Sequence, residues 1–109
     1  MLIDFSNIEE ILVTDPRGGK GEFYKKVFST GDHNIMLGRL TPGSRFGHHV
    51  HEAESETVYY VSGTGIMTYE GEQQPIVPGT AHHCPKGKGH WMENTGSEDL
   101  VFFAVLPKQ

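Results

Sequence analysis

The run from His48 to Glu56 contains three histidines and three glutamates in nine residues. Alternate side chains of an extended strand share one face, so we expect His49 and His51 to project together and His48 to project away. If the next strand begins near Glu56 and runs back antiparallel, its carboxylate lies beside this pair. Two imidazoles and a carboxylate are costly to bury together without a cation. The run therefore indicates a divalent metal site or, as the plainer alternative, a solvated loop of charged residues.

Two spaced motifs extend this pattern along the chain. The first is Gly43-x5-His49-x-His51-x4-Glu56-x6-Gly63, and the second is Gly79-x5-Pro85-x-Gly87-x2-His90-x3-Asn94. Fifteen residues, from Thr64 to Pro78, separate them. At every specified position both motifs resemble those of the cupin superfamily, and the separation is similar to that of small microbial cupins.

The resemblance implies an all-β fold, a double-stranded β-helix that forms a small jelly-roll barrel over about residues 34–106, with an N-terminal extension. It also implies one metal ion, bound by the two histidines and the glutamate of the first motif and by the histidine of the second. In this chain those positions are His49, His51, Glu56 and His90.

The donor set narrows the choice of ion without identifying it. Three imidazoles and one carboxylate include no thiolate, and on one side of an octahedron they leave two positions for water or substrate. Such a set suits Mn, Fe, Co, Ni or Cu, and Zn fits a more closed tetrahedral arrangement. We therefore expect one divalent metal ion as cofactor.

Three further residues are candidates for proton transfer. His82 and His83 are adjacent in the expected strand 80–84, so one of them must point inward if that strand belongs to the barrel wall. An inward histidine could act as a general acid or base, and the alternative is a core histidine bonded to backbone. Tyr60 is expected to line the pocket and to offer it a phenol.

The elements that must position these residues are short strands. From residue 22 onward, strand-forming runs alternate with turn signals rich in Gly, Pro and Asp. The expected strands span 22–29, 34–41, 47–51, 56–62, 64–69, 73–77, 80–84, 90–94 and 99–106. Before them, Ser6-Asn-Ile-Glu9 has the form of a capping box and predicts a short helix over 6–12. Residues 15–21 are expected to form a loop that could fold over another part of the molecule.

Length and composition bound the class of protein. The 109 residues suit a single domain over 1–109, and 14 glycines with 6 prolines favour many short elements over a helical bundle. Nine basic against 14 acidic residues give a formal charge of −5, which argues against nucleic acid or an anionic membrane as partner. One cysteine and no apolar segment of signal or membrane-spanning type make a cytoplasmic location the expectation.

These observations leave two classes of function open. A metalloenzyme would hold a small oxygen-containing metabolite at the open metal position, and the resemblance implies isomerase, lyase or dioxygenase chemistry there. A non-catalytic module would instead bind or sense a sugar or another small molecule, with the metal serving structure alone. Aromatic side chains on the outer sheet face favour a homodimer in either case.

Overall fold

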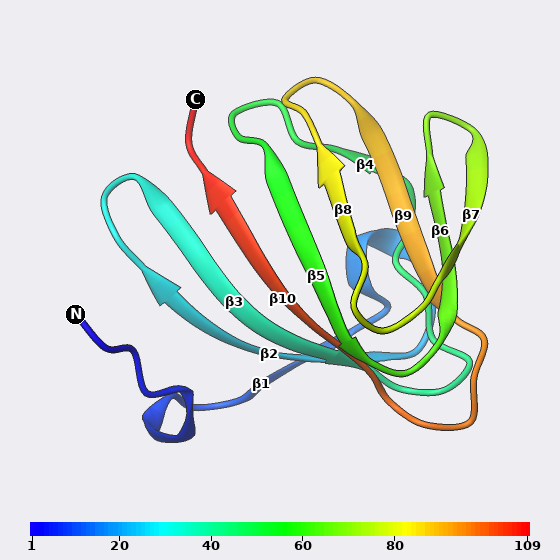
Figure 1. Cartoon of the computed structure of the whole chain (residues 1–109), viewed down its shortest axis with the longest axis horizontal. Coiled ribbons are helices and arrows are strands. Elements are labelled where there is room, and N and C mark those ends of the chain that lie inside the picture. Colours follow the sequence, from blue (N-terminus) through cyan, green and yellow to red (C-terminus); the bar gives the residue numbers. More distant parts are fainter.

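The computed structural model describes all residues, Met1–Gln109, and consists mainly of antiparallel strands in two sheets (Figure 1). One sheet has six strands in the order β1 (Ile11–Thr14), β2 (Glu22–Ser29), β3 (His33–Leu40), β10 (Leu100–Pro107), β5 (Glu56–Ser62) and β8 (Ala81–Cys84). The other has four strands in the order β4 (His49–Val50), β9 (Gly89–Asn94), β6 (Gly65–Tyr69) and β7 (Glu72–Ile76). Two single-turn 3₁₀ helices, η1 (Phe5–Asn7) and η2 (Pro16–Gly18), flank β1. The architecture is the all-β jelly roll expected from the sequence.

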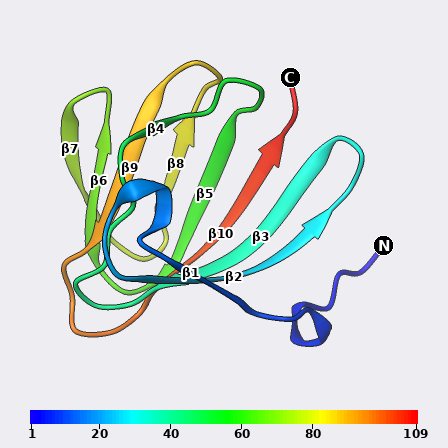
Figure 2. The same ribbon diagram turned by 180° about the vertical axis from the view of Figure 1, so that it is seen from behind.

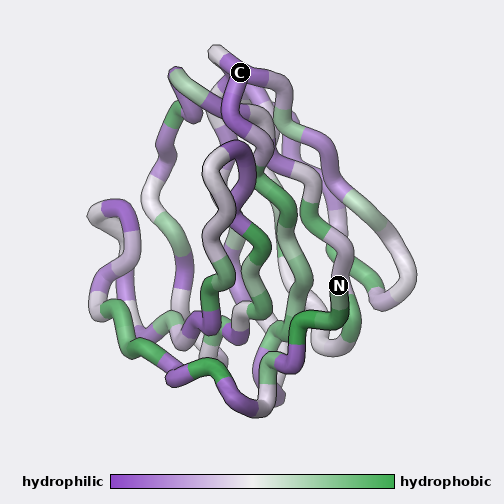
Figure 3. The backbone as a smooth tube through the Cα atoms, turned by 90° about the vertical axis from the view of Figure 1, so that its left-hand side faces the viewer, coloured by the Kyte–Doolittle hydropathy of each residue, from purple (hydrophilic) through white to green (hydrophobic).

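The core lies between the two sheets and follows the alternation of the strands. In β10 the inward side chains are buried and those between them are half-buried. The inward set of that strand is Leu100, Phe102, Ala104 and Leu106. The tube in Figure 3 changes repeatedly between apolar and polar colours along the strands, as expected for a sheet with one buried face.

The strand positions agree closely with the sequence. Each of the nine strands expected from residue 22 onward is present, with ends displaced by no more than two residues. The expected strand 47–51 keeps only His49–Val50 as β4. Its first part leaves the ladder because the N–H of Gly47 donates to the carbonyl of Pro16 in the η2 loop.

The expectation of a short helix over residues 6–12 is wrong. Only Phe5–Asn7 is helical, and the residue that caps it is Asp4, whose carboxylate accepts a hydrogen bond from the Ser6 N–H. Residues Ile11–Thr14 form β1 instead and pair antiparallel with β2. The edge of β2 offers a row of backbone partners, and this pairing overrides the local capping signal.

The N-terminal extension completes the larger sheet. Strand β2 lies between β1 and β3, and its Phe23 packs in the core with its ring stacked 5.7 Å from that of Phe102. Between β1 and β2 the η2 loop turns toward the β4 side of the barrel, as seen from behind in Figure 2. None of the helical segments has the length and apolarity that a membrane span requires.

Candidate metal centre

Four side chains converge inside the barrel from both sheets. His49 in β4 pairs directly with His90 in β9, and His51 follows β4 by one residue. Glu56 is the first residue of β5 in the other sheet. The expectation that Glu56 lies on the strand next to the histidine pair is wrong, because β4 pairs with β9 and β5 lies between β10 and β8. The connection from β4 to β5 crosses between the sheets, so the carboxylate approaches the imidazoles from the opposite wall.

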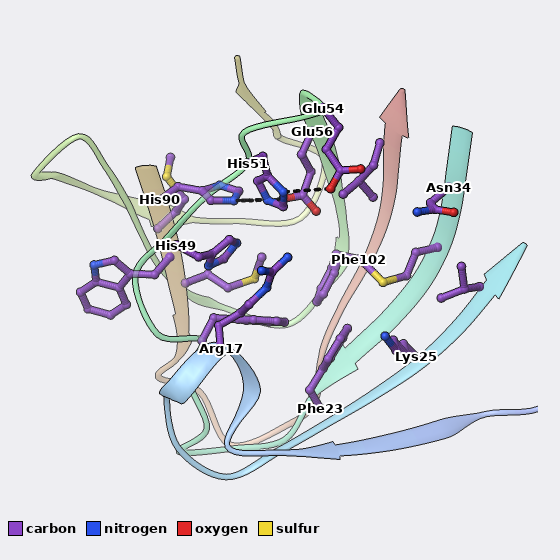
Figure 4. Close-up of a pocket in the computed structure, with 17 residues that line it drawn as sticks. Arg17, Phe23, Lys25, Asn34, His49, His51, Glu54, Glu56, His90 and Phe102 are labelled. Atoms are coloured by element: carbon purple, nitrogen blue, oxygen red, sulfur yellow. Dashed lines mark hydrogen bonds and ion pairs between the residues drawn. The ribbon is translucent and has the colours of Figure 1, made fainter. Parts of the chain in front are cut away.

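The ligand atoms of these residues face one another. His51 Nε2 lies 3.1 Å from Glu56 Oε1 and 3.1 Å from His90 Nε2, which is itself 3.0 Å from the same oxygen (Figure 4). One ligand atom from each of the four residues, His49 included, lies within 4.8 Å of the others. A cation about 2.1 Å from each ligand requires separations of at most roughly 4.2 Å. Small side-chain rotations therefore fit one ion to this set.

The opposite ring nitrogens have partners of their own, which fix the direction of each imidazole. His49 Nδ1 donates to the backbone carbonyl two residues earlier at 2.8 Å, and His51 Nδ1 donates to Glu54 Oε1 at 3.1 Å. His90 Nδ1 contacts His82 Nε2 at 3.0 Å. With the Nδ1 atoms engaged in this way, the Nε2 atoms are directed at the centre. Three imidazole nitrogens and a carboxylate oxygen are a donor set that a divalent cation satisfies.

Burial and hydrogen bonding set the charges of the cluster. Burial alone would raise the pKa of Glu56, but hydrogen bonds from His51 and His90 outweigh it and lower that pKa to about 2. The hydrogen bond to Glu56 raises the pKa of His51 despite its burial, whereas burial lowers the pKa of His49 to about 4. At neutral pH the carboxylate is ionised and His49 is neutral. A bound cation would replace the proton that His51 shares with Glu56.

A cavity of about 210 Å³ opens onto the cluster. Much of its wall is apolar, formed by Phe23, Met36, Phe46, Met67, Met92 and Phe102. Its other charged side chains are Arg17, Lys25 and Glu54 (Figure 4). The cavity is therefore a small chamber with an apolar wall and a few polar groups, as in many small-molecule sites.

The two adjacent histidines of β8 point in opposite directions. His82 is buried and contacts the ring of His90 from the side away from the cluster. It does not line the cavity. His83 lies exposed on the outer face, where its Nδ1 is 3.0 Å from the Thr57 hydroxyl. The inward histidine, which the sequence left unresolved, is therefore His82, and it touches a candidate ligand.

Tyr60 occupies the core and does not line the cavity. It is 2% exposed, and its hydroxyl has no hydrogen-bond partner. Burial raises its pKa, with a smaller contribution from the negative charge of Glu56. The phenol therefore stays protonated at neutral pH.

Arg17 and Lys25 are cavity residues that sequence reasoning missed. The Arg17 side chain extends from the η2 loop toward His49, and its positive charge makes minor contributions to lowering the pKa values of His49 and His51 (Figure 4). Lys25 projects from β2 on the same side as the buried Phe23. For Lys25 the period-two alternation within 22–29 was an available signal. For Arg17 the sequence offered only the expectation that residues 15–21 form a loop that could fold over another part of the molecule.

Sequence comparison identifies relatives for most of the chain. A family model described as "Cupin domain" matches residues 36–106. A Thermotoga maritima protein named oxalate-binding protein is 34% identical over 112 residues, which cover 97% of this chain and 93% of that protein. A Thermococcus gammatolerans protein named glucose-6-phosphate isomerase is 30% identical over 118 residues, and these cover 96% of this chain but 62% of the isomerase.

Solved structures show the same architecture. A Thermotoga maritima crystal structure described as "a predicted oxalate decarboxylase" superposes with a TM-score of 0.93 at 32% identity, over 100% of both chains. The polyketide cyclase RemF from Streptomyces resistomycificus gives a TM-score of 0.79 at 18% identity, over 98% of this chain and 78% of that one. At this lower identity the likeness is one of fold alone.

Proposed function

Because the chain belongs to the cupin family, we propose that it binds one divalent metal ion inside its barrel and a small oxygen-containing metabolite at that ion. The proposed ligands of the ion are His49, His51, Glu56 and His90. The observation that carries the proposal is the convergence of three Nε2 atoms and one carboxylate oxygen at the wall of a cavity. A buried cluster of this composition is strongly unfavourable unless protons or a cation neutralise it.

Each residue of the cluster has a distinct proposed part. Glu56 supplies the single negative charge, and the pKa of its carboxyl, lowered to about 2, keeps it ionised across the physiological range. Glu54 and His82 hold the rings of His51 and His90 through their Nδ1 atoms. Such outer partners orient a ligand and raise its basicity. We therefore assign His82 a positioning role that acts through His90.

The size and wall of the cavity favour a small chelating ligand. A volume of about 210 Å³ leaves room for a small molecule beside a metal ion, and much of the wall that it would contact is apolar. The relative from Thermotoga maritima carries the name oxalate-binding protein, and oxalate is a small molecule that offers two oxygens to one cation. Oxalate is therefore the first probe for this site.

Turnover of the bound molecule is the second candidate function. When bound, the ion would supply Lewis acidity that polarises a carbonyl group, as isomerase, lyase and oxygenase chemistry requires. Glu54 is a carboxylate at the cavity wall that is not a proposed ligand, so it is the group placed to move a proton there. Relatives named glucose-6-phosphate isomerase favour this candidate, although the chain spans only 62% of their length.

Calorimetry tests the proposal directly. Oxalate is titrated into protein loaded with Mn²⁺ or Co²⁺ and into the chelator-treated protein. We expect saturable binding near one equivalent for the loaded protein and none for the stripped protein. Equal oxalate affinity in the metal-loaded and the metal-free protein would contradict the proposal. Consumption of oxalate and release of CO₂ in the same samples would separate catalysis from binding.

A further inference from the structure

We propose that Arg17 determines which ligands the metal centre accepts, by pairing with a carboxylate of a small anion whose other oxygens chelate the ion. The segment from Asp15 to Gly21, which we call the clamp loop, holds this guanidinium at the cavity. The inference rests on the proposed function and specifies the ligand class of the same site. That class is a small dicarboxylate or 2-oxo acid, and a neutral sugar falls outside it.

The clamp loop is fixed by backbone hydrogen bonds to the segment that leads into β4. The Lys20 N–H donates to the Arg45 carbonyl at 2.9 Å, and the Arg45 N–H donates back to the Lys20 carbonyl at 2.8 Å. The Gly47 N–H donates to the Pro16 carbonyl at 3.0 Å. These bonds lie on both sides of Arg17 in the sequence. Its backbone is therefore fixed relative to His49, which lies two residues beyond the last of them.

The contact between the two segments is too close for side chains. A Cβ on Gly47 would collide with the Arg17 carbonyl, and a Cβ on Gly19 would lie 2.6 Å from the Gly47 nitrogen. Arg17 itself has a φ of 56°, in the left-handed region that is unfavourable for a residue with a side chain. Such conformations persist where surrounding contacts enforce them, and they concentrate at ligand clamps. The backbone of the loop is thus held in an unfavourable shape that directs this one side chain inward.

The charge of Arg17 is not neutralised within the protein. No salt bridge or side-chain hydrogen bond engages its guanidinium, in contrast to Arg39, which pairs with Glu10 and Asp99. The side chain lines the cavity and remains exposed to solvent. The guanidinium of an arginine presents two parallel N–H groups that match the two oxygens of a carboxylate. An unpaired guanidinium is therefore suited to bind an anion that enters from solvent.

The balance of charge in the cavity favours an anion. A divalent ion with neutral imidazoles and the single carboxylate of Glu56 keeps one net positive charge. Arg17 and Lys25 add two positive charges and the carboxylate of Glu54 removes one, so the cavity with its ion keeps an excess of two positive charges. A small dianion would neutralise this excess. A neutral ligand would leave this positive charge uncompensated.

Arg17→Gln is the test variant, and Arg45→Gln is its matched control. Arg45 is exposed on the segment to which the clamp loop is bonded, and only its backbone takes part in those bonds. Both variants and the wild type are loaded with Co²⁺ and titrated calorimetrically with oxalate. A second titration uses imidazole, a neutral ligand that binds to the metal alone. Metal content is measured on every sample.

We expect Arg17→Gln to weaken oxalate binding by about 10- to 100-fold, the range of a charge-assisted hydrogen-bonded pair. Imidazole affinity and metal content should stay within about twofold of the wild type. Arg45→Gln should bind both ligands as the wild type does, and Arg17→Lys should recover part of the oxalate affinity.

Three results would overturn the inference, and they differ from failure of the proposed function. Unchanged oxalate binding in Arg17→Gln would remove the residue from ligand selection. Equal losses for oxalate and imidazole would show that the substitution merely disturbs the centre. A wild type that binds metal but no oxalate would reject the anion class and leave the metal site intact. A wild type that binds no metal would reject the proposed function itself.

Discussion

The three candidate imidazole ligands are oriented by three different groups: a backbone carbonyl for His49, a carboxylate for His51 and a second histidine for His90. A histidine in this orienting role can accept a hydrogen bond from the Nδ1–H of His90 through its own Nε2. The contact is buried, with His82 7% and His90 2% exposed, so water cannot replace it without entering the core. This makes His82 a residue with a measurable effect on the metal centre.

Replacing His82 by alanine should weaken metal binding by about 10- to 100-fold, because His90 loses the partner that fixes its ring. His82→Asn should restore part of the affinity, since its side-chain oxygen can accept the same hydrogen bond. Competition with a chromophoric chelator measures these affinities. His83→Ala is the matched control, and the exposed position of His83 predicts no change. Equal effects at both positions would reject the positioning role.

The metal-free protein should lose stability as the pH falls from about 6.5 toward 4. Burial lowers the pKa values of His49 and His82 to about 4, whereas in the unfolded chain they lie near 6.5. Within this window the unfolded state binds more protons, so the free energy of unfolding decreases by up to about 1.4 kcal/mol per pH unit for each group. His51, whose pKa is raised, contributes stability that is fully present below about pH 6.5 and is lost only at higher pH, so it adds no dependence within this window.

Urea unfolding at pH 6.5 and pH 4.5 measures this dependence. His82→Asn should unfold with a smaller loss between the two values, because one of the two titrating groups is gone. A wild type that is equally stable at both values would contradict the assigned shifts. Protonation of the same histidines also competes with metal, so metal affinity should decrease over this range.

At the residue scale, the sequence could predict the four candidate ligands because they occupy two spaced motifs. It could not decide between His82 and His83, since a one-residue difference in register reverses which side chain points inward. Arg17 was missed for another reason. A loop residue reaches a site through turns and long-range contacts that have no periodic signature in the sequence.

At the scale of elements, the clamp loop depends on Gly19 and Gly47, which allow the loop to approach the segment before β4 closely. Gly47→Ala should destabilise the protein by about 1–3 kcal/mol, because the new Cβ meets the Arg17 carbonyl and the backbones must separate. The variant should also bind oxalate less tightly, since Arg17 is displaced. Gly31→Ala is the control, because a Cβ there meets nothing within 4 Å.

Urea denaturation and the oxalate titration read out the two effects together. Equal stability of Gly47→Ala and Gly31→Ala would contradict the close packing of the clamp loop. A large loss of stability with unchanged oxalate affinity would separate the loop from ligand binding.

The positions of the strands were predicted well where an alternation of apolar and polar residues is bounded by turn-forming residues. From residue 22 onward every expected strand is present, because strands such as β5, β8 and β10 alternate buried and more exposed side chains and most of the strands end at a Gly, Pro or Asp turn. The N-terminal helix failed because Ile11–Thr14 is recruited as an edge strand by β2, a contact between segments that local capping signals cannot report. Pairing of β4 with β9, and the resulting approach of Glu56 from the opposite sheet, likewise depend on the closure of the barrel.

At the scale of the whole molecule, we propose that the chain forms a homodimer through the outer face of the six-stranded sheet. Tyr59 and Val61 of β5 point outward and are 48% and 49% exposed. They lie beside the half-buried Phe103 of β10, and a group of exposed large apolar side chains is typical of an interface. Light scattering should give twice the chain mass of 12.1 kDa.

A charged substitution tests that interface. Val61→Lys should shift the mass toward that of one chain, because a lysine cannot be desolvated there without a partner. Val77→Lys is the control: Val77 is similarly exposed, at 47%, but follows β7 in the other sheet. A wild type that behaves as a single chain, or equal effects of both substitutions, would reject this face as the interface.

The central claim is that His49, His51, Glu56 and His90 hold one divalent ion. The most direct measurement is metal content by plasma mass spectrometry on untagged protein purified without chelators, beside the His49→Ala/His51→Ala double variant. We predict close to one equivalent of a transition metal in the wild type and almost none in the variant, with matching circular dichroism spectra. No metal in the wild type after reconstitution, or equal metal in both proteins, would contradict the account.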